Sequence, residues 1–132
     1  MLFRSVVSVT GSATTGSTSA AVTNPDAGTS TTANAFTVNI GPTIISPNST
    51  SKQTIPNNTQ ATFSITGSNF ASGSSVSFSG GFNTPSVTFV DASHLTVTVT
   101  AKNGNGNKGT FDLTVTNADG GSATSSGSMV NS

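Results

Sequence analysis

His94, the one histidine of the chain, is the first residue to consider for catalysis. Acid–base catalysis and metal binding by histidine need further groups, because a partner must orient the ring or complete the ligand set. Asp91 is close in sequence, but the chain has no Cys or Glu, and Asp91-Ala92-Ser93-His94 is typical of a turn before a strand. We therefore interpret His94 as structural and expect no catalytic, metal or cofactor site.

Two turns rich in Asn and Asp could offer oxygen ligands to calcium. They are Asn24-Pro25-Asp26 and Asn117-Ala118-Asp119-Gly120. Calcium takes about six to eight oxygen ligands, usually with several carboxylates, and one Asp per turn is too few. In the competing interpretation, the Asn or Asp side chain bonds its own backbone and Gly adopts a positive φ. We expect β-turns at both places.

Two other patterns suggest specialised chemistry. Gly67 and the Asn-Gly run at 103–107 could indicate a phosphate-binding loop, but no Lys-Ser/Thr pair and no helix follow, so we expect a hairpin loop. Lys102, Lys108 and Asp112 raise the question of a Lys–Asn isopeptide crosslink. That crosslink needs a buried lysine beside a carboxylate, and both lysines flank the Gly/Asn loop, where we expect solvated side chains.

The composition excludes several classes of partner. Charged residues make up 6% of the chain, against roughly 25% in an average soluble domain. The net charge is zero, so the chain lacks the clustered Lys and Arg that hold nucleic acid or anionic lipid. No apolar run approaches the roughly 20 residues of a membrane span. A surface of Ser, Thr, Asn and Gly with no net charge favours association over repulsion.

Asn48-Ser49-Thr50 and Asn57-Asn58-Thr59 match the acceptor pattern for N-glycosylation. Chance matches are expected in a chain this rich in Asn, Ser and Thr. The two motifs are therefore compatible with an exposed, exported surface and indicate nothing more specific.

An internal repeat organises the chain. Residues 20–39 read AAVTNPDAGTSTTANAFTVN and residues 113–131 read LTVTNADGGSATSSGSMVN, with their shared Thr-Asn pairs at an offset of 116 − 23 = 93. Upstream, Val7-Ser8-Val9-Thr10 resembles Val97-Thr98-Val99-Thr100 at an offset of 97 − 7 = 90. The first part of the chain therefore resembles the end of the second.

Alternating residues predict strands in the second part. Apolar or aromatic residues recur at every second position, which gives each strand an apolar face and a Ser/Thr face. They are Phe63 and Ile65; Val76 and Phe78; Val87 and Phe89; Leu95, Val97 and Val99; and Phe111, Leu113 and Val115. Turn-forming residues separate these segments, and no amphipathic helix is evident. The pattern predicts an all-β, immunoglobulin-like β-sandwich of two antiparallel sheets.

The repeat also predicts the domain boundaries. Residues 1–39 correspond to the C-terminal strands of a preceding or incomplete immunoglobulin-like repeat, and residues 40–132 to a complete domain. A lone hairpin is marginal in water, so the apolar face of the first part needs the missing strands. We predict that this face forms the contact between domains or subunits; its residues are Val7, Val9, Val22, Phe36 and Val38. Either the chain is part of a longer tandem-repeat protein, or another subunit completes the partial domain.

Three segments resemble parts of a known family. Pro42-Thr43-Ile44-Ile45-Ser46-Pro47-Asn48 looks like its opening strand, Phe63-Ser64-Ile65-Thr66-Gly67-Ser68-Asn69-Phe70 is similar to its strand ending in G-x-N-F, and residues 113–131 look like its last hairpin. Residues 40–132 thus resemble the IPT/TIG immunoglobulin-like domain. The resemblance implies the fold but no single function, because the family spans receptors, transcription factors, carbohydrate enzymes and bacterial surface proteins. Without the basic loops of its DNA-binding members, this sequence looks like the bacterial tandem-repeat type.

These observations predict a non-catalytic structural subunit or repeat of an extracellular filament, stalk or surface layer. The expected partners are copies of the chain or neighbouring immunoglobulin-like repeats, with no cofactor, no nucleic acid and no membrane insertion; a surface glycan or host ligand stays open. The alternative is an adhesive or carbohydrate-binding module of a larger surface protein. The chain has no Trp or Tyr, the usual platforms for sugars, which counts against that alternative.

Overall fold

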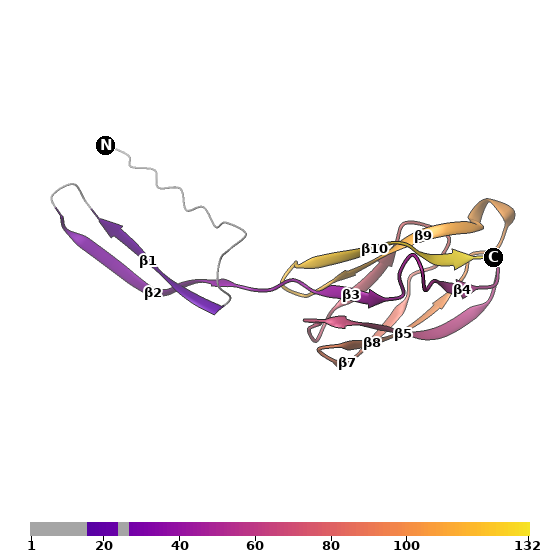
Figure 1. The fold of residues 1–132 in the computed structure, drawn as a ribbon, viewed down its shortest axis with the longest axis horizontal. Coiled ribbons are helices and arrows are strands. Elements are labelled where there is room, and N and C mark those ends of the chain that lie inside the picture. The colour runs from indigo at the N-terminus through magenta and orange to yellow at the C-terminus, as the bar shows by residue number, and fades with distance from the viewer. Residues whose placement is uncertain (1–15, 24–26) are drawn as a thin grey trace. The chain divides into compact units, whose positions relative to one another are not determined.

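The computed structural model describes residues 16–23 and 27–132 of the chain. It divides into two compact units, residues 1–40 and residues 41–132 (Figure 1). In the first unit, β1 (Gly16–Thr23) and β2 (Thr29–Val38) form a two-stranded antiparallel sheet. The second unit contains two four-stranded sheets.

The second unit is an immunoglobulin-type β-sandwich. One sheet has the order β3 (Thr43–Ser46), β5 (Gln60–Ser68), β8 (His94–Thr100) and β7 (Ser86–Asp91). The other has the order β4 (Gln53–Ile55), β10 (Ser122–Asn131), β9 (Gly109–Thr116) and β6 (Ser75–Phe78). Sorting sequential strands between two sheets in this order is the arrangement of the immunoglobulin fold. The predicted all-β immunoglobulin-like sandwich is confirmed.

One strand pairing departs from the antiparallel rule. β4 runs parallel to β10, with Gln53 opposite Met129 and Ile55 opposite Asn131. The chain leaves the first sheet after Ser46 and enters the second at Gln53, so the opening segment of the domain is divided between the two sheets. Because β4 covers the outer edge of β10 at its end, the backbone of residues 129–131 is paired on both sides.

The core lies between the two sheets and follows the predicted alternation. Its buried apolar residues are Ile55, Phe63, Ile65, Phe70, Val76, Phe82, Leu95, Val97, Val99, Ala101, Leu113, Val115 and Met129. In β8 every second residue is buried, because its neighbours on both sides and the facing sheet cover the inward face. On the edge strand β7, by contrast, Val87 is half-buried and Phe89 remains 39% exposed.

Candidate assembly site

The β1–β2 hairpin repeats the β9–β10 hairpin strand by strand. β1 and β9 each have 8 residues, and β2 and β10 each have 10. Both hairpins also carry a bulge at the same place. The pairs that flank it are Ala20–Thr32 and Thr18–Phe36 in the first hairpin, and Leu113–Ser125 and Phe111–Met129 in the second. All four positions differ by the offset of the sequence repeat (113 − 20 = 93), so the two hairpins share one register.

Unusual backbone angles recur at the same offset. The pairs of positions with positive φ are Gly16 (114°) and Gly109 (141°), Ala27 (68°) and Gly120 (89°), and Asn34 (53°) and Gly127 (59°). Asn34 and Gly127 lie within the bulges, where the extra residues of the longer strand must bend back into register. Asn tolerates the left-handed region better than most residues, so it can stand where the second hairpin has glycine.

The residues predicted to form the assembly site lie partly in this hairpin. Val7 and Val9 lie outside the described residues, whereas Val22 belongs to β1, and Phe36 and Val38 belong to β2. The backbone register pairs Val22 with Ser30, Phe36 with Thr18 and Val38 with Gly16. Their use in assembly stays a prediction.

The sandwich shows what covers these positions when the domain is complete. Adding 93 to Val22, Phe36 and Val38 gives Val115, Met129 and Asn131, which are 0%, 0% and 1% exposed. There, β4 pairs with β10 and β6 pairs with β9. Among the described residues, β1 and β2 pair only with each other. The first hairpin thus has the backbone of a hairpin that, in the complete domain, has a partner strand along each of its two edges.

His94 and Asp91 form an exposed pair in the turn between β7 and β8. The His94 Nδ1 atom lies 2.9 Å and 3.0 Å from the two carboxylate oxygens of Asp91. The backbone N–H of Ser93, at 2.7 Å, and the His94 side chain both lower the pKa of Asp91. Within residues 16–23 and 27–132, no three His, Cys, Asp or Glu side chains gather as a metal site would require. The pair lies in the turn before β8, where the Asp91 carboxylate also accepts the Ser93 N–H.

In the turn after β9, side-chain oxygen atoms accept hydrogen bonds from the protein itself. The Asp119 Oδ1 atom accepts a 3.0 Å hydrogen bond from the Gly121 N–H, and Gly120 has a φ of 89°. Asn117 is buried, and its Oδ1 atom accepts a 2.7 Å hydrogen bond from the Ser74 hydroxyl. The predicted β-turn is confirmed here, and the corresponding turn at Asn24-Pro25-Asp26 lies outside the described residues.

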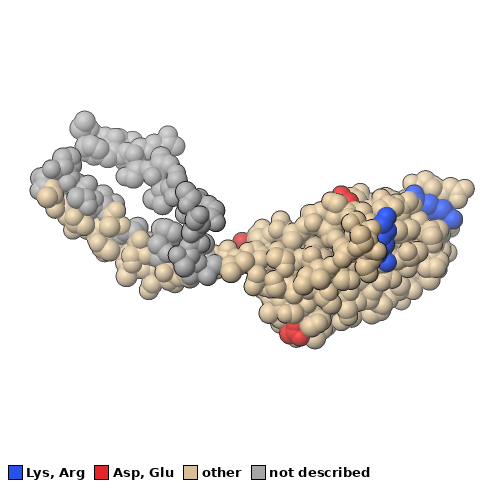
Figure 2. Space-filling model, viewed as in Figure 1, with Lys and Arg blue, Asp and Glu red and all other residues tan. Residues whose placement is uncertain are grey.

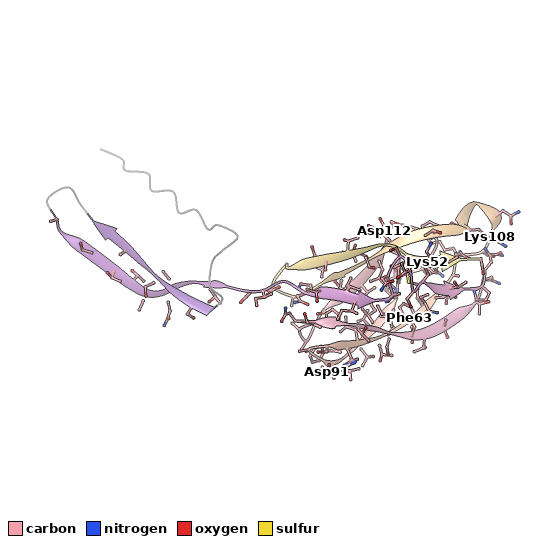
Figure 3. The ribbon with its side chains drawn as sticks, viewed as in Figure 1. Lys52, Phe63, Asp91, Lys108 and Asp112 are labelled. Carbon is pink, nitrogen blue, oxygen red and sulfur yellow. The ribbon has the colours of Figure 1, made fainter. Side chains whose placement is uncertain are left out.

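The lysines near the Gly/Asn loop are solvated, as predicted. Lys102 and Lys108 are exposed on either side of the short 3-10 helix η1 (Asn105–Asn107). Asp112, on β9, accepts a 2.8 Å hydrogen bond from the Gly127 N–H (Figure 3). In the described part of the chain, His94–Asp91 is the one contact within 4.0 Å between a basic and an acidic side chain. The arrangement therefore does not place a buried lysine beside a carboxylate.

Gly67 serves packing within the sheet. It lies in β5, and a Cβ atom at this position would overlap the carbonyl oxygen of Thr43 and the ring of Phe70. The absence of a side chain lets β3 approach β5 while the Phe70 ring, 4% exposed, packs across it. Packing therefore accounts for the Gly and the Phe of the G-x-N-F segment, and a phosphate-binding loop is not needed to explain them.

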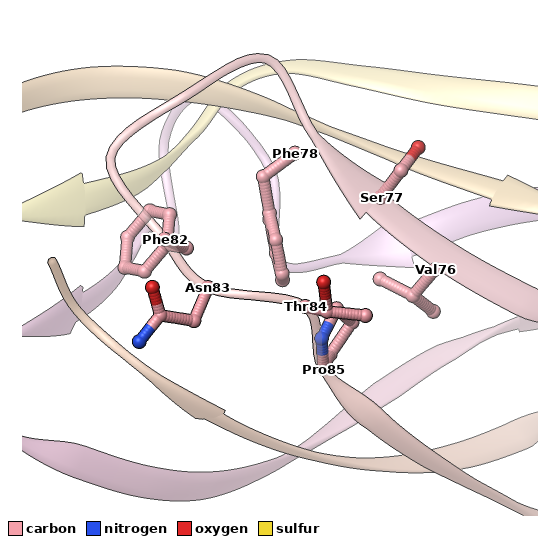
Figure 4. Close-up of a pocket in the computed structure, with 7 residues that line it drawn as sticks. All are labelled: Val76, Ser77, Phe78, Phe82, Asn83, Thr84 and Pro85. Atoms are coloured by element: carbon pink, nitrogen blue, oxygen red, sulfur yellow. The ribbon is translucent and has the colours of Figure 1, made fainter.

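The pocket beside β6 offers little chemistry. Its volume is about 190 Å³, below the roughly 300–1,000 Å³ of common ligand sites. It is lined by Val76, Ser77, Phe78, Phe82, Asn83, Thr84 and Pro85 (Figure 4). None of these side chains titrates in the ordinary pH range.

Among the described residues, no helix has the length and apolar character needed to cross a bilayer. The immunoglobulin-type sandwich is common to proteins of many functions, so the fold leaves the choice among them open. Comparison of the chain with protein-family models, curated proteins and solved structures found no match.

Proposed function

We propose that this chain is a non-catalytic structural subunit or repeat segment of an extracellular filament, stalk or surface layer, in which immunoglobulin-like domains join by completion or stacking. The observation that carries the proposal is the first hairpin. It repeats the register, bulge and positive-φ positions of β9–β10 at an offset of 93 residues. A repeated supersecondary unit that needs neighbouring strands to bury its face is characteristic of tandem-repeat architectures.

The outer surface of the sandwich supports this proposal. Hydroxyl groups pair across the exposed faces, with 2.7 Å between the Thr62 and Thr98 Oγ1 atoms and 2.8 Å between those of Thr114 and Thr124. Charged side chains are few on the face shown in Figure 2. Charge repulsion between copies of such a surface is weaker than between ordinary domain surfaces, so it opposes close packing less.

The proposed family is the bacterial tandem-repeat type of the IPT/TIG domain. The support is local: at the end of β5, Gly67 leaves room for the Thr43 carbonyl of β3, and the buried Phe70 packs beside Gly67. The opening segment from Pro42 to Asn48 supplies β3 and the crossing to the second sheet.

Electron microscopy of the purified chain, and of native material that contains it, tests the proposal. We expect regular filaments or layers with an axial repeat near one domain length. In native material that contains the neighbouring repeats, Phe36→Asp should abolish them, whereas Thr37→Asp, the matched control at the next residue of β2, should not, because Thr37 is exposed. Monodisperse monomers at every concentration, together with native material that shows no array, would refute a structural role in an assembly.

One observation favours the alternative, an adhesive or carbohydrate-binding module. Phe89 and Val90 on β7 are 39% and 57% exposed, which places an aromatic and an aliphatic side chain on a strand that, among the described residues, lies at the edge of its sheet. Aromatic rings are the usual platforms for sugar rings. If a panel of immobilised glycans retains the chain, Phe89→Ala should lose that binding and Thr88→Ala, on the same strand, should keep it.

A further inference from the structure

We infer that the β1–β2 hairpin closes a second sandwich whose remaining strands come from a preceding repeat, and that this preceding segment fills the space that the Phe111 ring occupies in residues 41–132. The inference rests on the proposed role in an array of domains. It adds the register of the missing strands and the side chains that they must carry.

The register follows from the sandwich. The last residues of β10, from Met129 to Asn131, pair in parallel with Gln53–Ile55. Subtracting 93 places a parallel partner strand along residues 36–38 of β2. On the other edge, β9 pairs in antiparallel fashion with Ser75–Phe78, which places a partner strand along residues 20–23 of β1.

A second copy of the chain is a poor source for these strands. Its own β4 and β6 already pair with its own β10 and β9. A second copy could use them only by releasing its last hairpin. The exchange would put Thr18, Ala20, Phe36 and Val38 in place of Phe111, Leu113, Met129 and Asn131, and so would remove the Phe111 ring that packs against Gly80 and Gly81. A preceding repeat, whose strands have no hairpin of their own to release, carries no such loss.

The missing segment must differ from residues 41–90 at one place. In the sandwich, the Phe111 ring packs against Gly80 and Gly81, where an added Cβ would touch or overlap it, and meets the Phe82 ring edge-on at 5.8 Å. The first hairpin has Thr18 at the position of Phe111. A glycine at the position of Gly80 would leave a void beside Thr18, so the true preceding segment needs a side chain there.

An extended protein tests both parts, with residues 41–90 of this chain fused ahead of Met1. Residues 41–90 hold the strands β3 to β6 and most of β7, and residues 7–10 resemble β8 in sequence. Relative to the unextended chain, we expect slower amide exchange along both hairpin edges, at residues 20–23 and 36–38. Unchanged exchange at these residues would overturn the inference. The signals of the second sandwich serve as the folding reference in every protein.

Variants at position 18 test the complementarity. In the extended protein, Thr18→Phe should raise the melting temperature of the first unit by about 5–10 °C, because the grafted glycines leave room for the ring. Ser17→Phe, at the next residue and exposed, is the matched control and should give no increase. When the fused segment carries Gly80→Ala, the order of the melting temperatures should reverse, so that the protein with Thr18 is more stable than the Thr18→Phe variant. A Thr18→Phe gain no larger than that of Ser17→Phe, or no reversal, would overturn this part.

The outcomes also separate the inference from the proposed function. Slowed exchange in the extended protein, without filaments in native material, would refute the proposed assembly and support the inference. Filaments in native material, with unchanged exchange in the extended protein, would support the proposed assembly and refute the inference. If the unextended chain shows slowed exchange at the same edges only when it dimerises, the occupant is a second copy and the inference is wrong.

Discussion

The side-chain amide of Asn131 donates a 2.9 Å hydrogen bond to the carbonyl oxygen of Gly81, which ties the last strand to the loop after β6. The same nitrogen lies 3.0 Å from the Lys102 carbonyl oxygen and 2.9 Å from that of Asn107. The carbonyl groups fix the orientation of the amide, because the reversed amide would set its oxygen against all of them. Among the described residues, the Asn131 Oδ1 atom is the one buried side-chain polar atom without a partner.

Asn131→Asp should destabilise the sandwich by about 2–4 kcal/mol at neutral pH, because a carboxylate replaces the donor and faces carbonyl oxygens in a buried site. Urea denaturation measures the free energy of unfolding. Asn83→Asp, at an exposed asparagine, is the control and should change it by less than about 0.5 kcal/mol. Equal effects of the two substitutions would contradict the role assigned to Asn131.

Gly81→Ala should cost about 2–4 kcal/mol, since Gly81 has a φ of 70° and an added Cβ would overlap the Phe111 ring. Gly106→Ala is the matched control, because an added Cβ there meets no atom within 4 Å. Combining Gly81→Ala with Phe111→Leu should recover part of the loss through relief of the overlap. Full additivity of these two changes in thermal unfolding would show that the ring and the glycine are independent.

Asn117 and Ser74 should be energetically coupled. The Asn117 Oδ1 atom accepts a 2.7 Å hydrogen bond from the Ser74 hydroxyl, and its Nδ2 atom donates a 2.7 Å hydrogen bond to the Asn69 carbonyl oxygen. Asn117 and Ser74 are both buried. Asn117→Ala should cost about 2–3 kcal/mol, because the Asn69 carbonyl and the Ser74 hydroxyl lose a partner. A double-mutant cycle with Ser74→Ala should show coupling of about 0.5–1.5 kcal/mol, whereas exposed Ser72→Ala should show none.

The pKa of Asp91 should lie below the usual aspartate value of about 3.9. The Ser93 N–H is the larger cause and the His94 side chain the second, so His94→Ala should restore only part of the shift. A lowered pKa stabilises the fold above the unfolded-state value, and this contribution is lost as pH falls through the folded-state pKa. An NMR titration of the Asp91 carboxyl carbon measures it, and a full return to the usual value in His94→Ala would contradict this order of causes.

The strands and their inward faces could be predicted from sequence because side-chain alternation is local. Phe63 and Ile65 in β5, and Leu95, Val97 and Val99 in β8, follow the period of two and are buried as predicted. Phe89 follows the same pattern but stays 39% exposed. Its strand lies at a sheet edge, and a period of two does not say whether a strand is central or at an edge.

The buried polar residues could not be predicted, because their partners are remote in sequence. Asn117 meets Ser74 across 43 residues, and Asn131 meets Gly81 across 50. Asn117 appeared in the sequence as part of the repeated Thr-Asn pair and of a turn considered for calcium, whereas Asn131 corresponds to Val38 at the offset of 93 residues. The repeat therefore marked a fixed place for Asn117 but gave no signal for the buried amide of Asn131.

The sequence by itself determined the alternation, the turns and the offset of 93 residues, since each is written in neighbouring or repeated residues. Only the tertiary structure decided that β4 joins the second sheet in parallel with β10, because that pairing joins residues 53–55 to residues 129–131. It also decided that the first hairpin repeats the bulge of the last one. Backbone register is set by hydrogen bonds between strands, and a linear pattern of side chains does not fix it.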